Sequence, residues 1–415
     1  MSLKLARLCA RTAALCIALT SGISYAQTTT FTLEEALQRA GVESPQISIS
    51  EAEIDIAEGN ERQAGIGPNP EVSLEVENVA GSGAFSGLRS NETTLMLTQP
   101  IELGGKRGAR VRAAEARSIV AEFDAQIAQA DLALLVRQRY TDAVTAKEQM
   151  ELARDVLERS TELYRIANEL VIAGREPPLR AIRAQAALGN AETNLAIAEA
   201  DYLNARLALA ELWGASSPPE TIETLWLNPD NVTVAQDITD SLTMRRANAE
   251  LLAAEAAVER ERRSAVPDLN IGAGIRRFEE SNDTAFTVGA SMAIPLRNRN
   301  QGSIAAASAE ARATEGRMLL MRLQLQREYS TLLNRVDALQ QRVETIESLV
   351  LPLAEEALDL ARTGYRYGKF NLIDVLDAAA TRDDARNTLI SAREDLAKST
   401  ASLVRLTQTQ RGNPS

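Results

Sequence analysis

The chain contains no histidine, and its only two cysteines, Cys9 and Cys16, lie close to the N-terminus. The absence of histidine excludes Ser/His/Asp and Cys/His triads, histidine general bases and every histidine metal site. Few common enzyme mechanisms remain, so we expect a protein that is not an enzyme. Aromatic residues make up only 4% of the 415 residues. The chain is instead rich in alanine, leucine, glutamate, glutamine and arginine, which is the composition of long packed helices.

The N-terminus has the order of a secretory signal peptide. Basic residues precede an apolar run at 13–19, and the small-residue motif SYA follows at 24–26. The apolar run is well short of the ~20 residues that a membrane-spanning helix needs. A signal peptide over residues 1–26 is therefore favoured over a membrane anchor.

Removal of this segment would take away three positive charges and no negative ones, which moves the formal net charge from −12 to −15. Cys16 follows Ala-Ala-Leu rather than the small residue that lipoprotein signals place before cysteine, so we predict no lipid anchor. The mature chain would be acidic and free of cysteine, with no disulfide framework and no expected nucleic-acid partner. No later window approaches ~18 consecutive apolar residues, so any membrane crossing must use strands.

The rest of the chain is an internal repeat. Each half opens with a helical stretch that ends at a proline-bearing break and continues through two alternating segments into a very long helix. A last helix follows a glycine break. The first helix-hairpin-helix repeat spans residues 27–215 and the second 240–410. Prolines predict a linker or equatorial segment at 216–239, and residues 411–415 are predicted to be a flexible tail.

The predicted long helices far exceed the usual length. Residues 105–172 would form a helix on the order of 100 Å long, and residues 300–363 a similar one. In the second, apolar residues follow alternating steps of four and three, which predicts a coiled-coil seam. The seam residues are Leu325, Tyr329, Leu332, Val336, Leu339, Val343, Ile346, Val350 and Leu353. The last helix repeats a seven-residue step at Leu389, Leu396 and Leu403. A globular helical bundle is the alternative, although helices of this length are rare in compact cores.

Two pairs of segments alternate apolar and polar residues, which predicts two β-hairpins. The apolar positions are Val72, Leu74, Val76, Leu95 and Leu97 in the first pair, and Leu269, Ile271, Ala273, Ile275, Phe286, Val288, Ala290, Met292 and Ile294 in the second. Polar or glycine-rich loops at 80–83 and 279–283 join the strands of each pair. Strands of ~9 to 11 residues with one apolar face are typical of transmembrane barrels. A soluble half-buried hairpin has the same alternation and is the alternative.

Four strands cannot close a barrel, and even eight strands leave an interior filled by side chains. A water-filled conduit would need about three copies of the chain, or twelve strands. The pore hypothesis therefore predicts an oligomer, in which the helices could form a second tube continuous with the barrel.

This plan and two motifs resemble the TolC-like outer membrane efflux proteins. The motifs are QPIELGGKRGARVRAAEA at 99–116 and YGKFNLIDVLDA at 367–378. The first motif is similar to the heavy-metal branch, typified by the outer membrane component of the cobalt-zinc-cadmium (CzcCBA-type) exporters. The resemblance covers nearly the whole mature chain.

The resemblance implies a homotrimer in the outer membrane of a Gram-negative bacterium. Its fold would be mostly α with a β-barrel portion: a twelve-stranded barrel in outer membrane lipid, continuous with a long periplasmic helical barrel. The implied partners are a periplasmic adaptor (membrane fusion) protein and an inner-membrane resistance-nodulation-division pump. The chain would be a passive exit duct for heavy-metal cations, with no cofactor and no metal site of its own.

Two other classes of protein remain as alternatives. A periplasmic coiled-coil adaptor or scaffold protein of an export system would share the signal peptide and the heptads, but it would not need two matched amphipathic hairpins. A secreted enzyme without histidine or cysteine would need carboxylate chemistry, and the sequence shows no paired-acid pocket for it.

The resemblance also implies a periplasmic gate at the tip of the second half. Asp374 and Asp377 fall where the family has acidic side chains that line the constriction, and Tyr365 falls where an aromatic helps to hold the tip closed. Three copies would bring six carboxylates around one axis and favour cations. Helix capping is the alternative role, because Asn371 precedes Asp374 by three residues and both aspartates suit a helix N-terminus.

The first-half counterpart of this tip, at residues 174–180, departs from the family pattern. Arg180 stands where the drug-exporting branch often has an acidic partner. Arg175 or Arg180 is therefore a candidate partner for the two aspartates.

Overall fold

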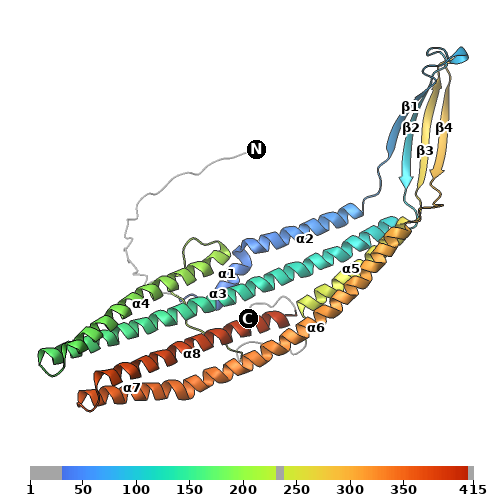
Figure 1. Ribbon diagram of the computed structural model, residues 1–415. Helices are drawn as coiled ribbons and strands as arrows, with labels where there is room; N and C mark the ends of the chain where they lie inside the picture. The colour runs from blue at the N-terminus through green and yellow to red at the C-terminus, as the bar shows by residue number, and fades with distance from the viewer. Residues whose placement is uncertain (1–29, 230–237, 410–415) are drawn as a thin grey trace, which may run out of the picture.

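The computed structural model describes residues 30–229 and 238–409. The predicted signal peptide, the predicted tail and part of the predicted linker lie outside these residues. Figure 1 shows an elongated molecule with a four-stranded sheet at one end of a long helical body and two helical hairpin loops at the other end.

Within residues 30–229, the first half of the chain contributes four α-helices, of which the first two begin at side-chain caps. They are α1 (Leu33–Glu43), α2 (Pro45–Ala64), α3 (Lys106–Ile172) and α4 (Pro178–Ala210). The Thr32 hydroxyl accepts the backbone N–H of Glu35 at 3.1 Å and so caps α1. Ser44 caps α2, whose first residue is proline. The 67 residues of α3 confirm the first predicted long helix.

Within residues 238–409, the second half contributes four more α-helices: α5 (Leu242–Ser264), α6 (Gln301–Thr345), α7 (Leu351–Arg366) and α8 (Leu372–Thr407). A π-helical turn, η4 (Ile346–Val350), joins α6 to α7, and together they form the second predicted long helix. Along the body α3 packs between α4 and α8, and α8 packs against α7. Among the described residues, no helix is both long enough and apolar enough to cross a membrane.

The coiled-coil seam follows the predicted heptads only as far as the π-helical turn. Leu325, Val336, Leu339 and Ile346 are buried, as are Leu389, Leu396 and Leu403 on α8. The prediction is wrong for Val350 and Leu353, which are 43% and 55% exposed. The π turn accommodates one extra residue ahead of Pro352, which has no N–H to donate. The seam therefore advances by one residue, and the buried side chains of α7 are Ala354, Leu358 and Ala361.

The sheet is antiparallel, with strand order β1-β2-β3-β4. The strands are β1 (Glu71–Glu77), β2 (Glu92–Ile101), β3 (Leu269–Phe278) and β4 (Thr284–Met292), which confirms both predicted hairpins. Because β2 pairs with β3, the two halves of the chain share one sheet. A short 3-10 turn, η1 (Gly83–Phe85), lies in the loop between β1 and β2.

One face of the sheet is apolar and exposed. In one row across the strands, Leu74 lies opposite Leu95, Leu95 opposite Ile275, and Ile275 opposite Phe286. Phe286 and the neighbouring Val288 are 88% and 86% exposed. Large apolar side chains in such a contiguous arrangement mark a surface that another molecule covers.

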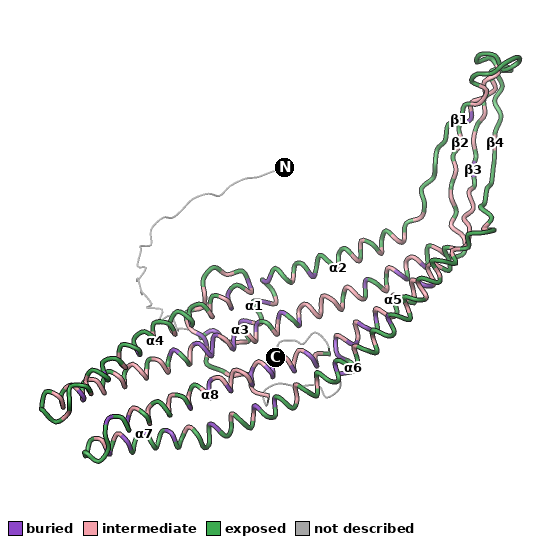
Figure 2. The backbone as a smooth tube through the Cα atoms, viewed as in Figure 1, coloured by how far each residue is buried: buried purple, intermediate pink, exposed green. Residues whose placement is uncertain are grey.

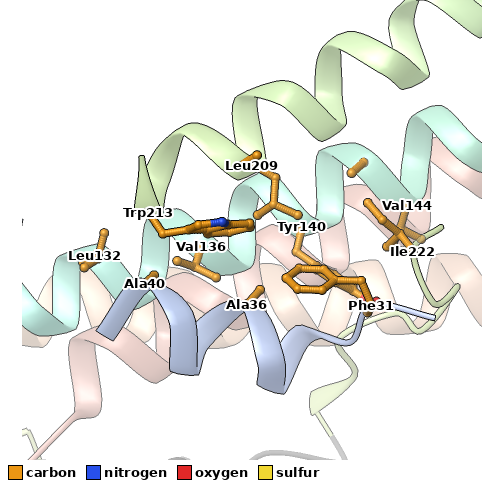
Figure 3. Close-up of a cluster of buried hydrophobic side chains, with 12 residues drawn as sticks. Phe31, Ala36, Ala40, Leu132, Val136, Tyr140, Val144, Leu209, Trp213 and Ile222 are labelled. Carbon is orange, nitrogen blue, oxygen red and sulfur yellow. The ribbon is translucent and has the colours of Figure 1, made fainter. Parts of the chain in front are cut away.

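The main core of the first half lies near the middle of the helical body and includes Phe31, Tyr140 and Trp213 (Figure 3). The rings of Phe31 and Trp213 are 5.6 Å apart between centroids. The hydroxyl of Tyr140 donates to the backbone oxygens of Phe31 and Glu223, at 3.1 and 2.9 Å. These bonds tie the described part of the segment after α4 to α3. Figure 2 shows exposed residues at the loops at both ends of the molecule.

Candidate functional site at the helical tip

Two short loops form the end of the molecule opposite the sheet (Figure 1). Residues 173–177 join α3 to α4, and residues 367–371 join α7 to α8. Each loop turns at a glycine with left-handed backbone, Gly174 at φ 69° and Gly368 at φ 71°, a conformation that costs other residues free energy. The two hairpins therefore present their loops at one common tip.

Asp374 is held by the start of α8. Its carboxylate accepts the backbone N–H of Asn371 at 2.8 Å, while the Asn371 side chain accepts the N–H groups of Ile373 and Asp374. This reciprocal arrangement is a capping box. The capping role expected for Asp374 is confirmed.

Asp377 lies one turn further along α8 and is exposed. Its backbone oxygen accepts the Thr381 hydroxyl at 3.0 Å. Within the described chain, its carboxylate makes no hydrogen bond or ion pair. Of the two aspartates, Asp377 is thus the one whose charge is not engaged by its own helix.

Tyr365 lies where the two hairpins meet. It packs against a buried cluster formed by Ala167 of α3, Ala184 of α4 and Leu372 of α8. The hydroxyl is buried and has no hydrogen-bond partner among the described residues. Burial raises the pKa of the Tyr365 hydroxyl, nearby Glu176 raises it further, and Arg180 opposes the shift. The tyrosine therefore connects the tips of the two halves through packing.

Arg175 lies in the first-half loop and Arg180 lies in the first turn of α4, and the two side chains have different surroundings. Arg180 forms an ion pair with Glu176 at 3.6 Å, and one of its terminal nitrogens is buried with no hydrogen-bond partner in the described part of the chain. Arg175 is exposed, and its backbone N–H donates to Leu170 at 2.9 Å. Among the described residues of this single chain, neither the Arg175 nor the Arg180 guanidinium contacts Asp374 or Asp377.

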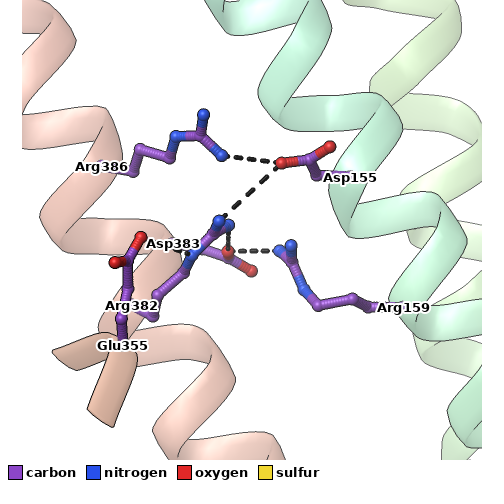
Figure 4. A network of polar contacts seen from close by, with 6 residues as sticks. All are labelled: Asp155, Arg159, Glu355, Arg382, Asp383 and Arg386. Atoms are coloured by element: carbon purple, nitrogen blue, oxygen red, sulfur yellow. Dashed lines mark hydrogen bonds and ion pairs between the residues drawn. The ribbon is translucent and has the colours of Figure 1, made fainter. Parts of the chain in front are cut away.

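A network of charged side chains joins α3 to α8 on the sheet side of the tip (Figure 4). It comprises Asp155, Arg159, Glu355, Arg382, Asp383 and Arg386. Arg386 contacts Asp155 at 2.7 Å, and Arg382 lies 3.8 Å from the same carboxylate. This network was not predicted from the sequence. The available signal was spacing, since Asp155 and Arg159, like Arg382 and Arg386, are four residues apart and share one helix face.

The described residues show no group of three or more His, Cys, Asp or Glu side chains placed to hold a metal ion. The charged groups of the tip are instead arranged as caps, as ion pairs between helices and as unpaired side chains facing solvent.

The sequence matches the outer membrane efflux protein family over residues 36–215 and 236–408. The cobalt-zinc-cadmium resistance protein CzcC of Cupriavidus metallidurans is 32% identical over 360 residues, which are 86% of this chain and 84% of that protein. The nickel-cobalt-cadmium resistance protein NccC of Alcaligenes xylosoxydans xylosoxydans is 31% identical over 290 residues, or 69% and 66% of the two chains.

A solved structure shares the fold. The crystal structure of CusC, described in connection with transmembrane channel formation, aligns with a TM-score of 0.77 at 18% sequence identity. The alignment covers 91% of this chain and 92% of that chain. The helical body and the four-stranded sheet therefore together form one known architecture.

Proposed function

The chain belongs to the outer membrane efflux protein family, and from this we propose that it is the outer membrane channel of a tripartite resistance-nodulation-division efflux system. Its fold is the TolC-like fold. The channel sits in the outer membrane of a Gram-negative bacterium, and its helices extend into the periplasm. Because the relatives CzcC and NccC are named for metal resistance, heavy-metal cations are the proposed cargo.

The observation that carries this function is the exposed apolar face of the sheet at one end of the helical body. Lipid is the partner that suits this face, since the opposite face is polar. The strands β1 and β4 each have one edge that no described strand pairs with. Pairing of β1 with β4 of a neighbouring copy would satisfy both edges. Three copies would then close a twelve-stranded barrel around a water-filled lumen.

The helical body supplies the periplasmic part of the duct. In its tip half, α3 and α8 lie between α4 and α7, so α4 and α7 are the edges that meet neighbouring copies. The tip faces the periplasmic adaptor protein and the inner-membrane pump. The duct is passive: it carries out no reaction and holds no cofactor, while the pump selects the cargo and supplies the energy.

The tip is proposed to act as a gate. Asp377 and Asp374 would surround the threefold axis, and Tyr365 would hold the two hairpins together. Arg180 and Arg175 would contribute opposite charge to the carboxylates of a neighbouring copy. The capping box of Asp374 supports a double role, since the same carboxylate can fix the start of α8 and contribute charge to the constriction.

The chain organisation is proposed to follow the repeat. Residues 1–26 would direct export and be removed. The two repeats, 27–215 and 240–410, would each contribute one hairpin to the barrel. Residues 216–239 would form an equatorial segment around the middle of the helical body.

Measurements on the purified protein and on a deletion strain test this function. Purified protein should be a trimer in detergent and should form water-filled channels in planar lipid bilayers. A strain that lacks the gene should accumulate cobalt, zinc or cadmium, and the wild-type gene should restore resistance. A stable monomer in detergent-free solution would contradict the pore and favour the adaptor or scaffold alternative.

A further inference from the structure

The polar face of the sheet carries its charges unevenly. All of its carboxylates lie on β1 and β2: Glu71, Glu75, Glu77 and Glu92. The same face of β3 and β4 consists of small or uncharged residues, with the exception of Arg276 near the outer end of β3. Within the described strands, Arg276 is the one basic residue on this face.

Arg276 reaches across two neighbouring strands. Its guanidinium lies 3.0 Å from the carboxylate of Glu92 on β2 and 3.3 Å from that of Glu77 on β1. Its Nε donates to the Thr94 hydroxyl at 2.9 Å. The guanidinium is therefore fixed by three polar groups on β1 and β2.

The two carboxylates that it bridges are direct cross-strand partners. Glu77 lies opposite Glu92 in the register of β1 and β2, and facing side chains of neighbouring strands start about 5 Å apart at Cβ. Two like charges at this spacing repel each other. Two carboxylates at this spacing also suit a divalent cation, which binds through several carboxylate oxygens.

We propose that Arg276 keeps the duct from retaining divalent cations: its guanidinium occupies the place between Glu77 and Glu92 where such a cation would otherwise bind. This inference rests on the proposed function, in which the polar face lines the lumen. A confined wall of carboxylates concentrates cations, so an unoccupied pair near the exit would hold the cargo. Because arginine stays protonated at any physiological pH, the pair remains occupied while cations pass.

The neighbouring Arg277 provides a matched control. It is the next residue on β3 and therefore lies on the opposite face of the sheet. Its guanidinium pairs with Glu279 at 3.4 Å and donates to the Asn282 side chain at 2.6 Å, outside the Glu77–Glu92 pair. R277Q removes one positive charge at nearly the same position along β3. It does not free the carboxylates of Glu77 and Glu92.

The test is block of single channels by Zn²⁺ in planar bilayers, with monovalent salt carrying the current. For R276Q the Zn²⁺ concentration that halves the current should fall roughly tenfold. R276Q/E92Q, which removes one carboxylate of the freed pair, should return to the wild-type value. R276K, which keeps the positive charge, and R277Q should also block like wild type.

Unchanged Zn²⁺ block in R276Q, or block that persists in R276Q/E92Q, would overturn the proposal. If Arg276 only braces the strands, R276Q lowers the trimer's heat stability and leaves block unchanged. If wild-type protein forms no channels, the proposed function itself fails, and that outcome is separate from these.

A second variant covers the case in which R276Q does not assemble. The sequence after residue 26 contains no cysteine, so R276C would be the single thiol of the mature chain. Block is measured before and after reaction with 2-aminoethyl methanethiosulfonate, which places a positive charge at this position in an assembled channel. Because Zn²⁺ also binds thiolates, a parallel reaction with neutral methyl methanethiosulfonate caps the thiol without adding a charge. Strong block that remains after the neutral reagent and disappears after the charged one supports the proposal. Block that the charged reagent does not change, or that the neutral reagent alone removes, overturns it.

Discussion

The guanidinium of Arg386 on α8 lies 2.7 Å from the carboxylate of Asp155 on α3, which joins the two halves of the chain near the helical tip (Figure 4). Arg159 of α3 pairs with Asp383 of α8 in the same network. Any movement that separates the α7–α8 hairpin from α3 must break these pairs. The network is therefore a brace on the side of the proposed gate.

Neutralisation of Asp155 should loosen this brace. The pair with Arg386 is partly exposed, so D155N should cost less than about 1 kcal/mol of stability. A change of that size shifts a two-state opening equilibrium by up to roughly fivefold. The open probability of single channels should rise in D155N. Glu199, which pairs with Arg154 at 3.1 Å on the surface of the first half, is the control, and an equal rise in E199Q would contradict a specific role.

Because the π-helical turn holds one extra residue, deletion of a residue within the turn should be tolerated better than deletion of a residue in α6. Ser348 lies in the turn and Ser330 lies in α6; both are exposed, and both hydroxyls donate to the backbone oxygen four residues earlier. Deletion of Ser348 should remove the extra residue and keep the packing of α6 and α7 in register. Deletion of Ser330 should rotate the following seam by about 100° and prevent assembly. Trimer yield measures both, and equal yields would show that the turn does not set the register.

Substitutions of the two tip aspartates should separate the helix-capping role of a carboxylate from its contribution to the charge of the constriction. D374A removes one side of the capping box and should cost about 1 kcal/mol of local stability. D377N removes a carboxylate without a partner and should leave stability within about 0.5 kcal/mol of wild type. D377N should nevertheless make the channel less cation-selective, as measured by the reversal potential under a salt gradient at matched trimer yield. Unchanged selectivity in D377N would remove it from the gate.

The topology can be tested with single cysteines at opposite ends of the molecule. Ser82 lies in the loop between β1 and β2, and Ala173 lies at the helical tip; both are exposed. S82C should react with an impermeant thiol reagent on intact cells, whereas A173C should react only after the outer membrane is broken. The reverse pattern would contradict the proposed orientation.

Acid should weaken the junction between α5 and α6. The Asn300 side chain donates to the Glu261 carboxylate at 2.9 Å; this bond, with one from Arg260, lowers the Glu261 pKa below its ordinary 4.5. A lowered pKa in the folded state means that the ionised group stabilises the fold above the ordinary value, and that this stability is lost as pH falls through the folded value. Wild type should therefore melt at a higher temperature than E261Q at pH 7, and the difference should shrink below pH 4.5. A difference independent of pH would contradict the assignment.

Several features were predictable because they depend on neighbours within one or two turns of the chain. Alternation at Val72, Leu74 and Val76 predicted a strand with one apolar face, and the heptads from Leu325 to Ile346 predicted a buried seam. The capping role of Asp374 followed from Asn371 three residues earlier. These patterns are local, because the period of a strand or helix places side chains on a face whatever lies elsewhere in the fold.

Other features required the tertiary structure. Pro352 marks a possible break, but the packing of α7 against α8 decides that the extra residue is absorbed in a π turn, so that Val350 faces outward. Arg276 meets Glu77 only because β2 pairs with both β1 and β3 in a particular register. The residue types and the periodicity of the sequence determined which side chains share a face of a helix or a strand. Contacts between charges far apart in sequence were decided by the placement of whole helices and strands, because a charge interacts strongly only with what lies within a few ångströms of it.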